Sequence, residues 1–228
     1  MIRAIIVCEG QTEEVFVNRV LGPPLAARDI FVEPRIIATS KHGKGGALKE
    51  QRVLRFLRNT LRERSDVYVT TFFDLYALPS DFPGLSEAIA HADPLERATT
   101  IEAGFHASVI QEAGCRQDRF LPHIQPYEFE ALLFSDITQF ANVQPAWKGF
   151  IGQLEAIRQS APSPEHINDG NDTHPSARLR HLRPPYKKVS HGEAVSSRIG
   201  LERMRAECRH FDKWLTCVES LTPLRQAG

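Results

Sequence analysis

Three apolar runs, separated by helix-like stretches, restrict this chain to a small set of folds. The runs cover residues 1–8, 30–38 and 66–73, and the last is β-branched or aromatic almost throughout, as buried strands are. Residues 47–64 repeat apolar side chains at helical spacing, and residues 94–113 also predict a helix. Strands that alternate with helices are typical of a parallel sheet, so we predict an α/β fold.

The rest of the chain predicts one more strand and a helical tail. Residues 120–125 predict an edge strand, because Pro122 has no N–H to donate to a neighbouring strand. A helix is predicted to open with residues 128–134, and no convincing strand follows. We therefore predict a parallel sheet of about four strands with helices on both faces in residues 1–135. Residues 136–228 are predicted to form a helical extension packed on that domain.

The composition argues against a protein that binds its partners through overall charge or that is anchored in a membrane. The 28 Lys and Arg residues balance 28 Asp and Glu residues, so no global field draws the protein to nucleic acid or to anionic lipid. Any site for a polyanion must be a local patch. The first residues predict no signal peptide, and no window approaches the roughly 18 apolar residues of a membrane span. We expect a cytoplasmic protein with no membrane partner.

The spacing of cysteines and histidines predicts no zinc site. The four cysteines form no CxxC pair and have no histidine at metal-ligand spacing, which favours reduced thiols in a cytosolic protein. His123, His174 and His181 do not follow the H-x-x-x-H pattern, which argues against a zinc hydrolase.

Acidic residues stand at the carboxyl ends of the predicted strands. Glu9 follows the first strand, Asp74 the third, and Glu128 or Glu130 the fourth. We prefer Glu130, because Glu128 also suits the first turn of a helix, as Glu13 does. The carboxyl ends of parallel strands meet at one edge of a sheet, so these side chains should converge. Convergent carboxylates bind Mg²⁺, and such a site can activate water against a phosphodiester.

Basic residues are expected beside the same edge of the sheet. Lys44 belongs to the glycine-rich loop 41–46, which follows the second strand and feeds a helix amino terminus that favours phosphate. A flexible linker is the alternative for this loop. Lys187, Lys188 and His191 form a basic turn for which a phosphate-binding role and a structural role are about equally favoured.

Five short motifs resemble those of a known family. Residues 7–13 resemble the V-x-E-G-x-T-E opening of Toprim-like domains, the catalytic modules of primases, topoisomerases and OLD-type nucleases. Together with residues 70–76, 129–134, 167–170 and 186–192, this opening is similar to a bacterial Toprim-like family that is a domain of unknown function. The resemblance spans nearly the whole chain, and it implies the compact four-stranded Toprim sheet.

The resemblance also implies a role for each acidic residue. Glu9 matches the glutamate that acts as general acid/base, and Asp74 matches the first metal-binding aspartate. Glu130 or Glu13 would complete the coordination of Mg²⁺ or Mn²⁺. Toprim domains usually carry a second aspartate two residues after the first, where this chain has Tyr76. The expected activity is metal-dependent phosphodiester hydrolysis by a nuclease that acts on DNA or RNA.

Two other functions stay open at this point. Without the second aspartate, the chain is alternatively a non-catalytic Toprim-like interaction subunit. Relatives of this kind are often encoded beside ABC/AAA-type ATPases in bacterial phage-defence systems, so such an ATPase is the expected partner. A receiver-type phosphoacceptor at Asp74 is a weaker interpretation, because the first strand ends in the single carboxylate of Glu9 where receivers place an acidic pair.

Overall fold

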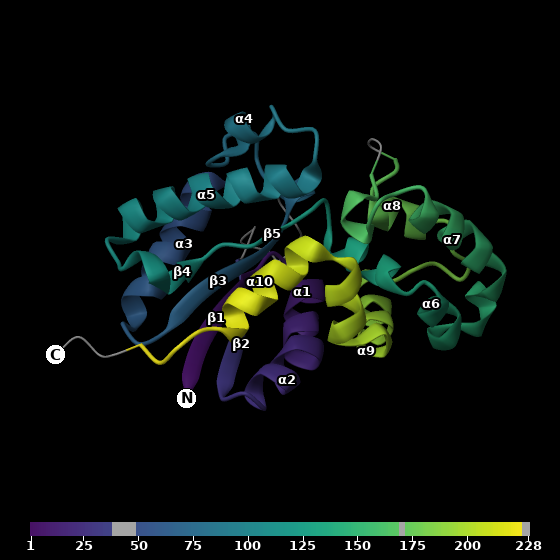
Figure 1. The fold of residues 1–228 in the computed structure, drawn as a ribbon, viewed down its shortest axis with the longest axis horizontal. Coiled ribbons are helices and arrows are strands. Elements are labelled where there is room, and N and C mark those ends of the chain that lie inside the picture. The colour runs from purple at the N-terminus through teal and green to yellow at the C-terminus, as the bar shows by residue number, and fades with distance from the viewer. Residues whose placement is uncertain (38–48, 169–171, 225–228) are drawn as a thin grey trace.

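A parallel sheet forms the centre of the protein (Figure 1). The structure is a computed structural model, and it describes residues 1–37, 49–168 and 172–224. The strands run in the order β2-β1-β3-β4, β5 also pairs with β3, and every pairing is parallel. The predicted α/β class is therefore confirmed. The strands are β1 (Ile2–Cys8), β2 (Ile30–Ile36), β3 (Tyr68–Asp74), β4 (Phe120–Leu121) and β5 (Ile124–Gln125).

Helices make up most of the remaining described structure. The α-helices are α1 (Gln11–Phe16), α2 (Gly22–Ala26), α3 (Glu50–Glu63), α4 (Leu85–Ala88), α5 (Pro94–Ala113), α6 (Thr138–Val143), α7 (Ile151–Gln159), α8 (Pro175–Leu179), α9 (Lys188–Glu207) and α10 (Arg209–Glu219). A π-helical turn, η1 (Val17–Leu21), connects α1 to α2. Within the described ranges, none of these helices has both the length and the apolarity that crossing a bilayer requires.

Side chains of the strands alternate between two hydrophobic cores. Ile6 and Cys8 of β1 face the first core, which also contains residues of α1, α9 and α10. Ile5 and Val7 face the second core, which contains residues of α3 and α5. This period of two is what a sheet buried on both faces requires, and helices cover both faces (Figure 1).

The last helix completes the first core over the middle of the sheet. Trp214 of α10 packs on Phe72 of β3, with ring centroids 5.4 Å apart. Its indole N–H donates to Thr70 Oγ1 over 2.8 Å, so the buried polar atom is paired. Residues on either side of position 135 therefore share one core. The boundary predicted there stays a prediction.

Two predicted elements differ in detail. Residues 120–125 form two short strands rather than one, interrupted at Pro122 and His123. Thr71 Oγ1 bridges the break, since it donates to the His123 carbonyl over 3.0 Å and accepts from the His123 N–H over 2.9 Å. The helix predicted at residues 128–134 is the 3₁₀-helix η4 (Phe129–Ser135), whose seven residues are all buried.

Candidate functional site

Five carboxylates gather at the carboxyl ends of β1 and β3. Glu9 and Asp74 lie at the ends of these strands, Glu13 lies in the first turn of α1, and Glu128 and Glu130 lie at the start of η4. Carboxylate oxygens of Asp74, Glu128 and Glu130 lie within 4.8 Å of one another. We call these five residues the acidic cluster. The structure thus brings together chain segments that are up to about 120 residues apart, as parallel strand topology requires.

Backbone N–H groups fix three of these side chains. Glu9 Oε1 accepts from the Asp74 N–H over 2.8 Å, and Asp74 Oδ1 accepts from the Phe129 N–H over 2.8 Å. Glu13 Oε2 accepts from the Gly10 N–H over 3.0 Å, as in a capping box at the start of α1. In the part of the chain that the structure describes, no hydrogen bond occupies the second oxygen of any of these three carboxylates.

Four of the five carboxylates, all but Glu128, hold their protons more tightly than exposed ones do. Burial, aided by repulsion from Glu13, raises the pKa of Glu9 from its usual 4.5 to about 8. Burial raises the pKa of Glu130 to about 7, and it raises the pKa of Asp74 well above its usual value, with repulsion from Glu9 as the next cause. Such shifts follow from the burial of several carboxylates side by side, and they are typical of functional sites.

Lys188 supplies positive charge from the start of α9. Its Nζ lies 3.4 Å from Glu130 Oε1 and 3.8 Å from Glu128 Oε1, and the side chain is half exposed. Burial opposes its charge, but Glu130, Glu128 and Asp74 outweigh that effect and raise the pKa of Lys188. The lysine is therefore an ammonium ion at neutral pH. Glu130 Oε1 is nevertheless buried without a hydrogen-bond partner among the described residues.

Glu128 is the carboxylate that its surroundings satisfy best. Its Oε2 lies 2.9 Å from His174 Nδ1 and accepts from the Ser176 N–H over 2.8 Å, and its Oε1 accepts from Ser176 Oγ over 3.0 Å. Burial alone would raise the pKa of Glu128, but Lys188 and these hydrogen bonds outweigh it and lower that pKa. The sequence favours Glu130 over Glu128 and predicts no role for His174 or Ser176, because nothing local to either segment links them to Glu128.

A comparison with protein families adds the identity of the domain. The family model described as "Domain of unknown function (DUF4276)" matches residues 8–219, which is 212 of the 228 residues. The chain belongs to the DUF4276 family. This DUF4276 match includes all five carboxylates and Lys188. Neither the comparison with curated proteins nor the comparison with solved structures found a match.

The other basic residues predicted for the DUF4276 chain differ in how they lie relative to the acidic cluster. The Lys187 N–H donates to His191 Nδ1 over 2.9 Å, so His191 closes the turn that leads into α9. The His191 ring also meets Trp147 edge-on, with centroids 4.7 Å apart. Lys187 is exposed beside this turn. Of the predicted cationic residues, Lys188 contacts the acidic cluster, while Lys44 falls outside the described residues.

A hollow of about 360 Å³ follows β3 directly in this DUF4276 domain. Leu75, Tyr76, Arg97 and Tyr127 are among the residues that line it. Tyr76 is well exposed, and its ring lies 5.0 Å from that of His174, the partner of Glu128. Tyr127 has a φ of 60°, a left-handed conformation that a bulky residue rarely adopts. Strain of this kind often accompanies a functional site.

Proposed function

We propose that this DUF4276 protein is a phosphodiester hydrolase that depends on Mg²⁺ or Mn²⁺, a nuclease acting on DNA or RNA, with a Toprim-like fold. The observation that carries the proposal is the charge imbalance of the acidic cluster. Five carboxylates face one nearby ammonium group among the described residues, and the oxygens of three lie within 4.8 Å of one another. A hard divalent cation with oxygen ligands relieves that repulsion.

The environments of the acidic residues suggest which are metal ligands and which transfers protons. Asp74 and Glu130 are the proposed ligands, because each has a carboxylate oxygen that no hydrogen bond from the described residues occupies. Glu13 lies at the edge of the same site as a further ligand. When bound, the cation would polarise the phosphodiester and lower the pKa of a coordinated water. Glu9 is the proposed general acid/base or a further ligand, because its carboxylate is fixed beside Asp74 by the Asp74 N–H.

The surroundings of the cluster suit a nucleic-acid substrate. Lys188, half exposed at the cluster, is placed to neutralise a phosphate oxygen. Tyr76 and Tyr127 line the neighbouring hollow with Arg97, and aromatic side chains are the groups on which nucleic-acid bases stack without sequence preference. A local site of this kind is also what a chain with zero net charge requires.

One observation favours a second candidate function, a non-catalytic Toprim-like interaction subunit of an ABC/AAA-type ATPase. Lys188 Nζ already lies 3.4 Å from Glu130, so it is a resident counter-ion where a metal would otherwise be needed. Tyr76 stands where Toprim domains usually have their second aspartate. In this alternative the cluster and the lysine form a structural ion-pair network.

A cleavage assay with metal titration distinguishes the two candidates. Purified protein is incubated with plasmid DNA, single-stranded DNA and RNA, with Mg²⁺, Mn²⁺ or EDTA. We expect metal-dependent cleavage that Glu9→Gln and Asp74→Asn abolish and that Glu202→Gln, an exposed change on α9, leaves intact. The absence of cleavage, together with no metal-dependent rise in melting temperature, would reject the nuclease in favour of the interaction subunit.

A further inference from the structure

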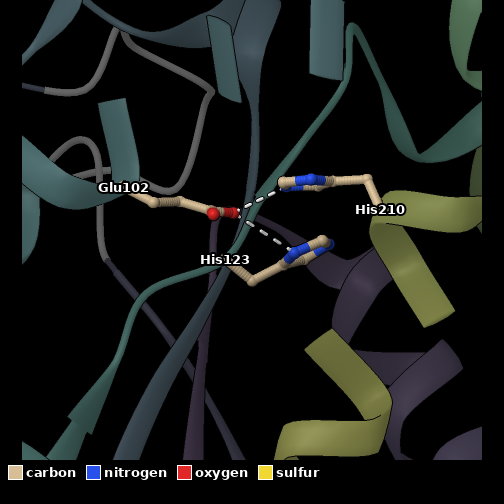
Figure 2. Close-up of side chains that lie close together, drawn as sticks. All are labelled: Glu102, His123 and His210. Atoms are coloured by element: carbon tan, nitrogen blue, oxygen red, sulfur yellow. Dashed lines mark hydrogen bonds and ion pairs between the residues drawn. The ribbon is translucent and has the colours of Figure 1, made fainter. Parts of the chain in front are cut away.

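A second group of metal-binding side chains shares no residue with the acidic cluster. Glu102 comes from α5, His123 from the break between β4 and β5, and His210 from α10, and Figure 2 shows the carboxylate directed at both imidazoles. Glu102 Oε1 lies 2.7 Å from His210 Nε2 and 3.5 Å from His123 Nδ1. One potential ligand atom from each residue lies within 4.8 Å of the others.

The two imidazoles are buried among aromatic rings. His123 is completely buried, and His210 is 5% exposed. The His123 ring stacks on Trp214, with centroids 4.6 Å apart and planes inclined by 16°, and it lies 5.1 Å from the ring of Phe72. Polar atoms in such surroundings are costly unless they are paired.

The hydrogen bonds of His123 leave one ring nitrogen unpaired. Its Nε2 lies 3.3 Å from Gln125 Oε1, and in the tautomer that donates to this oxygen Nε2 carries the proton and Nδ1 carries the lone pair. Nδ1 then presents a lone pair toward the carboxylate of Glu102, and it is buried with no hydrogen-bond partner among the described residues. A cation between Nδ1 and the carboxylate would pair both atoms, as a proton on Nδ1 would across the 3.5 Å that separates them.

Further contacts have the form of an outer shell around a metal. Histidines that bind metals usually donate their second N–H to an oxygen acceptor, as His123 does to Gln125. Glu102 Oε1 is itself oriented by the Ile124 N–H over 2.9 Å. His210 belongs to the first turn of α10. Its backbone N–H donates to Glu165 Oε2 over 2.9 Å, and this hydrogen bond fixes the turn.

We propose that Glu102, His123 and His210 bind one divalent transition-metal ion of the Zn²⁺ class. Two imidazoles and one carboxylate form a known zinc donor set, and they leave a fourth position open. Ligand atoms placed tetrahedrally about 2.1 Å from an ion lie about 3.4 Å apart, close to the 3.5 Å between Glu102 Oε1 and His123 Nδ1. The 2.7 Å hydrogen bond between His210 Nε2 and Glu102 Oε1 would lengthen when an ion replaces its proton.

The proposed metal site is open to solvent, and a bound ion would hold three elements together. A cavity of about 260 Å³, lined by Glu102, His210, Lys213 and Cys217 among others, gives an ion a route in and leaves room for a water. A bound ion would connect α5, the edge of the sheet and α10. Sequence spacing did not predict this site, because its ligands lie 21 and 87 residues apart along the chain.

Metal analysis of the full chain tests the proposal. Protein stripped with a chelator is titrated with Zn²⁺, and separately with Co²⁺, in excess Mg²⁺ that saturates the acidic cluster. We expect about one Zn²⁺ per chain, a rise in melting temperature, and the visible absorption of tetrahedral Co²⁺. Glu102→Gln and His210→Gln should each weaken binding at least 100-fold while the far-ultraviolet circular dichroism stays unchanged.

Controls separate this site from other ligands. Glu130→Gln removes a carboxylate of the acidic cluster and Cys217→Ser removes the exposed thiol beside the cavity, and both variants should bind Zn²⁺ as the wild type does. X-ray absorption of the Zn²⁺-loaded wild type should report two imidazole ligands, which needs no variant to fold. Failure to bind Zn²⁺, an all-oxygen coordination sphere, or binding that survives both ligand substitutions would overturn the proposal. The three side chains would then be a buried hydrogen-bond network.

Discussion

Replacing Glu9 by glutamine should stabilise the metal-free protein at alkaline pH. The carboxyl group has a pKa of about 8 in the folded protein, against a usual value of 4.5. The folded state therefore keeps a proton that the unfolded chain has already released. Stability from this group is complete below pH 4.5 and is lost as the pH rises through 8. Glutamine keeps the oxygen that accepts from the Asp74 N–H and carries no charge, so it avoids this loss.

The size of the effect follows from the two pKa values. A change from 4.5 to about 8 corresponds to about 5 kcal/mol, since each tenfold change in an equilibrium constant is about 1.4 kcal/mol. Because Glu13 and Asp74 share the repulsion, we expect roughly 2–5 kcal/mol of added stability at pH 9. For a chain of this size that is a rise in melting temperature of roughly 5–15 °C.

Thermal unfolding in EDTA at pH 5, 7 and 9 measures the effect, with Glu202→Gln on the exposed face of α9 as the matched control. The advantage of Glu9→Gln should be below about 1 kcal/mol at pH 5 and should grow steadily toward pH 9. Saturating Mg²⁺ should then raise the melting temperature of the wild type more than that of the variant. A variant that gains nothing at pH 9, or gains equally at all three pH values, would refute the reasoning.

Three further substitutions probe the surroundings of the cluster. Lys188→Met removes a half-exposed ammonium beside Glu130, so stability in EDTA at pH 8 should fall by about 1 kcal/mol, and Mg²⁺ should restore it; an unchanged melting temperature would contradict this. Ser176→Ala removes the hydroxyl bonded to Glu128 but keeps the backbone bond, so urea unfolding should report a loss of about 1 kcal/mol and not a gain. Tyr186→Phe removes a buried hydroxyl without a hydrogen-bond partner in the described ranges, so urea unfolding should report equal or slightly higher stability. A loss above about 1 kcal/mol would show that this hydroxyl is bonded.

The elements that sequence analysis predicted well are those with local signals. Helix α5 is an example, since its predicted range of 94–113 is the observed one. Asp93 caps it by accepting from the Leu95 and Glu96 N–H groups, and Gly114 ends it with a φ of 64°, which glycine adopts without strain. Residues 120–125 were less predictable, because the side chain of Thr71 from another strand bridges their break.

The candidate site also contains residues that local sequence signals predict and residues that only long-range contacts place. Glu9 and Asp74 were predictable because each directly follows an apolar strand, and strand direction alone then brings them to one edge. The hydrogen bonds of Glu128 were not predictable, since their donors lie 46 and 48 residues further along the chain. His123 was dismissed on spacing, although packing places it 3.5 Å from Glu102. Contacts between distant segments depend on how the helices pack, which periodicity does not encode.

The position of α10 over β3 has a consequence for synthesis on the ribosome. Phe72 and Phe211 pack with ring centroids 6.4 Å apart, yet about 140 residues separate them. At translation rates of 5–20 residues per second, roughly 7–30 s would pass between the synthesis of β3 and the synthesis of α10, which covers it. During that interval one apolar face of the emerging chain is open to chaperones and to aggregation.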